Sequence, residues 1–136
     1  MNVLIHWKEK YNVNIKEIDQ QHKKLIDMIN VLHDAIIRKE DKNIMAQIIS
    51  DMRDFAFIHF KTEEKYFSRI GYKDAESHKA EHKFFLEHVE IFYEEFQNYD
   101  SSLAVEVMTF LKDWFINHIV QLDKTYAAKL VDNGIQ

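Results

Sequence analysis

Four polar side chains of this sequence form two pairs whose spacing suits metal binding. His59-Phe-Lys-Thr-Glu63 and His78-Lys-Ala-Glu-His82 each place two potential ligands four residues apart. On a helix, residues at this spacing project from one face with their Cβ atoms about 5–6 Å apart. Each pair can therefore bind one metal ion or contribute to a site that holds two.

Three further side chains extend the set, namely His22, His118 and Asp123. His118 and Asp123 lie five residues apart, which on an ideal α-helix separates them by about 140° around the axis. The spacing of this pair alone therefore does not select it as a pair of ligands.

The composition excludes several other kinds of site and partner. Because the chain has no cysteine, it cannot form a disulfide, an iron–sulfur cluster, a c-type haem attachment or a thiolate zinc site. The net charge is −5, with acidic and basic residues interleaved, so we expect no nucleic-acid partner. The first ten residues are mixed in polarity and precede no long apolar run. We therefore expect no signal peptide, no membrane association and a cytoplasmic location.

Long helices are the elements that must position these side chains. The chain has no proline and only two glycines, whereas β-hairpins and β-sandwiches need turn residues at many places. Apolar residues recur with helical periodicity in four segments, with Asp41 as the expected N-cap of the second and Gly71 at its end. We predict a single all-α domain, an up-down-up-down antiparallel four-helix bundle with an N-terminal arm. The domain is expected to span residues 1–136, with the arm at about 1–16. The four helices are expected at about residues 17–38, 42–69, 74–98 and 101–130.

Sequence distances place the seven polar side chains at about one level of this bundle. His22 and His59 lie 18 and 19 residues from the expected turn near residue 40, and His82 and His118 each lie 18 residues from the turn near residue 100. With a rise of about 1.5 Å per residue, antiparallel helices bring these groups to similar heights. Each remaining member lies four or five residues from one of these four, namely Glu63, His78 and Asp123.

The number of these side chains indicates two metal ions. One histidine on a core stripe is most often a core residue that donates to a carbonyl group. Seven such groups need a joint explanation, because a buried polar group without a partner costs about 1–3 kcal/mol. They exceed the four ligands of tetrahedral zinc and the six of one octahedral ion. They suit two octahedral irons, with both carboxylates and a solvent-derived oxygen as bridges and the histidines divided three and two. One coordination position is then open to a small ligand.

The complete pattern resembles the hemerythrin family, specifically the stand-alone bacteriohemerythrins. Trp7 lies where the family has an N-terminal tryptophan, and the resemblance extends over essentially the whole chain. It rests on four stretches, which are Asp-Gln-Gln-His at 19–22, His-Phe-Lys-Thr-Glu-Glu at 59–64, His-Lys-Ala-Glu-His at 78–82 and Asp-Trp-Phe-Ile-Asn-His-Ile at 113–119.

This resemblance implies a carrier or store that binds dioxygen reversibly and is not an enzyme. Its cofactor would be two iron ions, Fe2+ or Fe3+, joined by an oxo or hydroxo bridge. By this resemblance, the six-coordinate iron would be bound by His78, His82 and His118. The five-coordinate iron, which binds oxygen, would be bound by His22 and His59. The bridging carboxylates would be Glu63 and Asp123.

Side chains near the ligands would either wall the oxygen pocket or pack as ordinary core residues. Phe115 departs from the leucine that many relatives have there, which bears on pocket volume and ligand access. Tyr126 matches a tyrosine frequent in the bacterial branch, and would hydrogen-bond near the site or simply pack. The expected wall residues are Leu25, Phe60, Trp114, Phe115 and Ile119, and the histidines that match no ligand position are His6, His33 and His88.

Three other functions stay open at this point. A ferritin-like oxidase typically uses Glu-x-x-His pairs, and the sequence has none. An oxygen or redox sensor would need a separate partner protein, which the sequence does not identify. Nitric oxide or peroxide could bind at the same open position. Because five neutral imidazoles donate less negative charge than a carboxylate-rich site, we rank reversible binding above oxidation.

Overall fold

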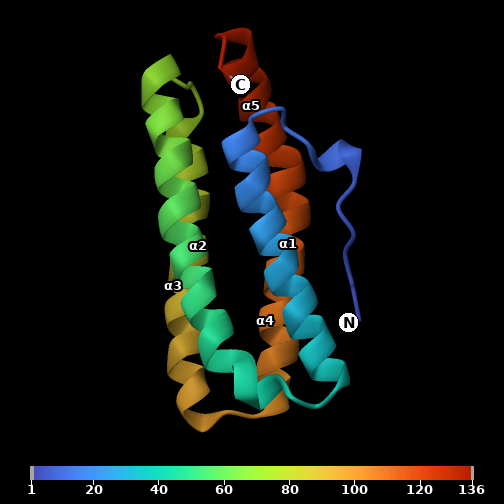
Figure 1. Ribbon diagram of the computed structural model, residues 1–136. Coiled ribbons are helices and arrows are strands. Elements are labelled where there is room, and N and C mark those ends of the chain that lie inside the picture. Colours follow the sequence, from blue (N-terminus) through green and yellow to red (C-terminus); the bar gives the residue numbers. More distant parts are fainter. Residues whose placement is uncertain (1, 136) are drawn as a thin grey trace.

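The polypeptide folds into long helices that lie alongside one another (Figure 1). A computed structural model describes residues 2–135, apart from the side chain of Leu122. Its longer elements are α1 (Lys16–Ile37), α2 (Asp41–Ile70), α3 (Ala75–Glu95), α4 (Ser101–Trp114), the π-helix η3 (Phe115–Asp123) and α5 (Lys124–Asp132). Two short 3₁₀ turns are η1 (Glu9–Tyr11) and η2 (Phe96–Asn98). The all-α, antiparallel four-helix bundle predicted from the sequence is confirmed.

The turns between the helices have identifiable causes. Gly71 adopts a left-handed φ of 61° and its N–H donates to the carbonyl of Phe67, which ends α2. Lys39 has a φ of 57° in the turn between α1 and α2. Asp100 caps α4, because its carboxylate accepts from the N–H of Ser102 at 2.7 Å.

Asp41 is not the N-cap of α2, contrary to the prediction. It is the first helical residue, and Glu40 occupies the cap position without a side-chain hydrogen bond. The carboxylate of Asp41 is buried and accepts from the hydroxyl of Tyr99. This contact ties the α1–α2 turn to the chain that follows α3.

The fourth expected helix, residues 101–130, is divided into three parts. α4 ends at Trp114, a π-helical segment follows, and α5 continues to Asp132. In a π-helix each carbonyl bonds to the N–H five residues later rather than four, so the angular positions of the following side chains shift. The 3.6-residue apolar period does not anticipate this change.

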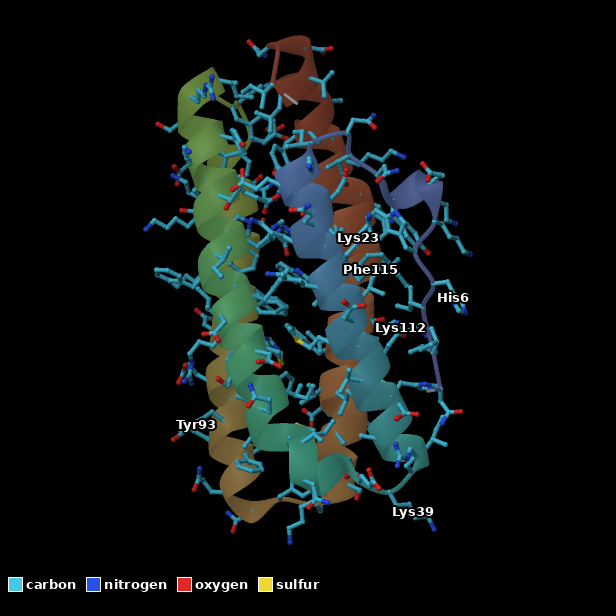
Figure 2. All side chains as sticks on the ribbon, viewed as in Figure 1. His6, Lys23, Lys39, Tyr93, Lys112 and Phe115 are labelled. Atoms are coloured by element: carbon cyan, nitrogen blue, oxygen red, sulfur yellow. The ribbon has the colours of Figure 1, made fainter. Side chains whose placement is uncertain are left out.

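The N-terminal arm runs along the outside of the bundle beside α1 (Figure 1). The amide oxygen of Asn30 accepts from the N–H groups of Leu4 and Ile5, both at 2.9 Å, and its amide nitrogen donates to the carbonyl of Ile5. Further along the arm, the ring of Tyr11 lies edge-on to Phe115, with ring centroids 4.9 Å apart. Figure 2 shows Phe115 on the side of the bundle along which the arm runs. The arm therefore covers this side of η3.

Apolar side chains fill the bundle in two clusters. The larger one contains Ile29, Met52 and Val107, each fully buried, and the smaller one contains Phe67 and Tyr126. Among residues 2–135, none of the helices has both the length and the apolar character that crossing a bilayer requires.

Candidate metal centre

The seven side chains expected to bind metal come together inside the bundle. They arise from α1, α2, α3 and η3, and none is more than 4% exposed. These side chains are His22, His59, Glu63, His78, His82, His118 and Asp123.

Their donor atoms form two groups, and within each group the atoms lie within 4.8 Å of one another. The first group has three histidines and the second has two, which is the division that the resemblance implies. We call the first the three-histidine group, which consists of Glu63, His78, His82 and His118. We call the second the two-histidine group, which consists of His22, His59 and Asp123.

Asp123 faces both groups. Its Oδ2 atom lies 3.1 Å from Nε2 of His22 and 3.2 Å from Nε2 of His59. Its Oδ1 atom lies 2.8 Å from Nε2 of His78 and 3.1 Å from Nε2 of His118. Each oxygen of one carboxylate therefore points to a different group, as a ligand shared by two ions requires.

Glu63 also lies between the two groups, but only one of its carboxylate oxygens contacts the histidines. Its Oε1 atom lies 3.0 Å from Nε2 of His82 and 3.3 Å from Nε2 of His59, which belong to different groups. Its Oε2 atom is buried and has no hydrogen-bond partner among the described residues. An unpartnered buried carboxylate oxygen is costly, and a bound cation would satisfy it.

The π-helix explains the five-residue spacing that sequence analysis could not use. On an α-helix His118 and Asp123 would point in different directions, whereas η3 contains both and brings them to one face. Nε2 of His118 consequently lies 3.1 Å from Oδ1 of Asp123. π-helical turns within α-helices occur frequently at functional sites, and this one carries two of the seven side chains.

The carboxylates and two of the histidines in the layer shift the pKa values of one another. Burial opposes protonation of His118, but the charges of Asp123 and Glu63 outweigh it and raise its pKa to about 10. The same two carboxylates raise the pKa of His78 against the effect of burial. Burial also opposes ionisation of Glu63 and Asp123, yet the surrounding histidines lower both pKa values. The two carboxylates thus favour the protonated forms of His78 and His118, and a bound metal ion would displace these protons.

The set of donors fits iron. Imidazole nitrogen and carboxylate oxygen are ligands that suit Fe2+ and Fe3+, and no thiolate competes for a softer metal. Burial lowers the pKa of His22, which leaves its ring neutral and able to bind a metal. These residues therefore fit a pair of iron ions.

Comparison with known proteins decides the family. Residues 13–130 match the family model of the hemerythrin HHE cation binding domain. The chain belongs to the hemerythrin family. It is 32% identical over 126 residues to a bacteriohemerythrin of Clostridium acetobutylicum, covering 88% of this chain and 96% of that protein. It is 35% identical over 120 residues to one of Pseudomonas aeruginosa, covering 88% of this chain and 77% of that protein.

A solved structure agrees with this assignment. The crystal structure of a wild-type hemerythrin superposes with a TM-score of 0.73 at 30% sequence identity, covering 93% of this chain and 97% of that chain. The similarity in fold therefore covers most of both chains, as the sequence match does.

Aromatic rings pack directly against the histidines of this layer. Phe60 stacks on His82 with ring centroids 3.9 Å apart, and Trp114 stacks on His118 at 4.1 Å. Both of these predicted wall residues thus contact the three-histidine group. Phe55 stacks on His59 at 5.0 Å, a contact that sequence analysis did not single out.

The other predicted wall residues are buried close to the layer. Leu25, Phe115 and Ile119 are each at most 1% exposed and belong to the larger apolar cluster. The ring of Phe115 packs on Tyr11 of the arm. Their role as a pocket wall stays a prediction.

Tyr126 also packs against the layer, through His78. Its ring lies edge-on to His78 with centroids 5.3 Å apart, and its hydroxyl is buried without a hydrogen-bond partner among residues 2–135. Burial, together with the charges of Glu63 and Asp123, raises the pKa of this hydroxyl. The hydroxyl of Tyr126 therefore stays protonated, while its ring packs on His78.

The three remaining histidines lie outside both groups. His6 is exposed. Nδ1 of His33 lies 3.1 Å from the carbonyl of Asn2, and Nδ1 of His88 lies 3.0 Å from the carbonyl of Phe84. The structure does not bring these three to the layer.

Proposed function

We propose that this hemerythrin-family chain binds dioxygen reversibly at two iron ions held by the layer of five histidines and two carboxylates. The observation that carries the proposal is the position of Asp123, which presents one oxygen to each group. Relatives of the chain are named bacteriohemerythrins, which supports the same function.

The two groups offer different numbers of ligands. Three histidines would bind one ion, and only His22 and His59 would bind the other. Glu63 and Asp123 would contribute ligands to both ions. A solvent-derived oxo or hydroxo group would complete the bridge between the ions. Iron bound here would change between Fe2+ and Fe3+ and so supply the electrons that dioxygen binding needs. The ion with two histidines has fewer protein ligands, so we place dioxygen beside it.

The surrounding side chains protect this chemistry by excluding water. The seven polar groups are enclosed by apolar clusters, and the rings of Phe55, Phe60 and Trp114 cover three of the histidines. Restricted access of water and protons favours release of dioxygen unchanged over its reduction. The wall predicted at Leu25, Phe115 and Ile119 would extend this enclosure.

The charge of the ligands favours binding over oxidation catalysis. Two carboxylates would be shared by the two ions, and the other five ligands would be neutral imidazoles. Oxidising enzymes of the ferritin-like kind use more carboxylates, which stabilise highly oxidised iron better. We therefore propose a binding protein rather than an oxidase.

Oxygen uptake tests the function directly. The protein is loaded with Fe2+ under anaerobic conditions, and dioxygen consumption and release are followed with an oxygen electrode while the gas phase is cycled. We expect one dioxygen per two irons to be taken up and the same amount to be released. Consumption without release would contradict the proposal, and a zinc-loaded sample serves as the control.

A further inference from the structure

Gln21 directly precedes His22 on α1, and it contacts His59, the α2 histidine of the two-histidine group. Its amide oxygen lies 2.7 Å from Nδ1 of His59, on the side of the ring away from the metal layer. Both side chains are buried, Gln21 to 9% exposure and His59 completely. Gln21 therefore belongs to the layer immediately behind the ligands.

A short chain of hydrogen bonds fixes the orientation of this amide. The hydroxyl of Thr62 donates to the carbonyl of Ile58 at 2.8 Å, which uses its single proton. It can then only accept from the amide nitrogen of Gln21, which lies 3.2 Å away. The amide oxygen is thereby directed to His59, whose Nδ1 must carry the proton. The lone pair of Nε2 is left facing the layer.

The three-histidine group has a different partner at the corresponding place. Nδ1 of His82 lies 3.0 Å from Oε2 of Glu64, and a carboxylate can only accept, so it fixes the same tautomer. An anionic acceptor makes the imidazole a stronger ligand than a neutral acceptor does. Nδ1 of His22 in one group and Nδ1 of His118 in the other both lack a partner among the described residues, so the contrast lies between Gln21 and Glu64. The two groups thus differ in the charge behind their ligands as well as in the number of histidines.

We propose that Gln21 is a positioning residue that holds the Nε2 lone pair of His59 toward the metal. Because its amide is neutral, whereas Glu64 places a carboxylate behind His82, the two-histidine position binds its metal ion more weakly than the three-histidine position does. This inference rests on the proposed metal-binding role of the layer. The three-histidine position fills first and keeps its ion longest. The two-histidine position, where we place dioxygen, exchanges its ion more readily.

Cobalt titration of the metal-free protein tests the inequality without dioxygen. We expect Co2+ to bind in two steps. In Gln21→Met the second step weakens by about 10–100-fold while the first is unchanged. Glu64→Gln weakens the first step instead. Gln21→Glu places an anionic acceptor behind His59 and tightens the second step beyond that of the wild type. Gln47→Met, which alters an exposed glutamine of α2 bonded to Asp51, leaves both steps unchanged.

A second measurement follows the hydrogen bond itself. In the zinc-loaded, diamagnetic protein the Nδ1 proton of His59 exchanges slowly with water, as seen by nitrogen-edited NMR. Gln21→Met accelerates this exchange, Thr62→Val does so to a smaller extent, and Thr62→Ser preserves the slow rate.

The outcomes separate this inference from the proposed function. Two cobalt steps that Gln21→Met leaves unchanged, or weakens by the same factor, overturn the inference alone. A wild-type protein that binds a single cobalt overturns both. Circular dichroism and thermal unfolding of each metal-free variant show whether a change in affinity comes from loss of the fold.

Discussion

Replacing Asp123 by asparagine removes one negative charge and one of the two oxygens, with little change of shape. In the structure those oxygens serve different groups, because Oδ1 lies 2.8 Å from His78 and Oδ2 lies 3.1 Å from His22. An asparagine amide has a single oxygen, so it can serve one metal position at most. The second ion then loses a ligand outright.

The expected magnitude follows from this loss. Removal of a partner behind a ligand typically weakens metal binding by about 10–100-fold, so removal of a ligand weakens it by more than about 100-fold. This corresponds to more than about 2.8 kcal/mol. The first ion keeps an oxygen ligand and loses only the attraction of the charge, so its affinity falls less.

Cobalt titration and iron analysis measure both effects for Asp123→Asn. We expect a weakened second cobalt step and an iron content close to one per chain. Asp113→Asn is the matched control, because Asp113 is an exposed carboxylate at the end of α4. Two cobalt equivalents bound as tightly as in the wild type would refute the shared position of Asp123.

Three other substitutions give further predictions. His59→Ala removes one of two histidines beside the proposed oxygen position, so the optical change on exposure to air disappears; a wild-type spectrum would contradict the assignment. Glu63→Ala removes a bridge and lowers the iron content well below two per chain, and a full complement by metal analysis would argue against bridging. Tyr99→Phe removes the hydroxyl that donates to Asp41 and lowers the free energy of unfolding by about 1.5 kcal/mol at pH 7, measured by urea denaturation. That hydrogen bond lowers the pKa of Asp41 below its ordinary 3.8, so the stabilisation is complete above about pH 4 and declines as the pH falls through the folded pKa. A difference between wild type and variant that persists unchanged at pH 2 would rule out this origin.

Much of the site could be predicted because it depends on regular helix geometry. The i,i+4 spacing of His59 and Glu63 places both on one face of α2, wherever that helix lies. Counting residues from the turns brings His22 and His118 to the same level, since every helix rises by the same amount per residue. The side chains that converge in the structure are those that these two rules select, with one exception.

The exception and the missed contacts depend on interactions that a local pattern does not contain. Asp123 reaches the layer only because η3 is a π-helix, which α-helical geometry does not describe. Gln21 meets Thr62 across 41 residues, and Asp41 meets Tyr99 across 58. Such pairs form when the helices dock. The N-cap predicted for Asp41 was therefore wrong, and no local pattern in the sequence indicates the contact of Gln21 with His59.

The most direct test of the two-metal layer is a crystal structure of the iron-loaded protein with data collected at the iron absorption edge. We predict two anomalous scattering peaks, one within the three-histidine group and one within the two-histidine group, with the carboxylate of Asp123 between them. A single peak, or two peaks that share no carboxylate, would contradict the account.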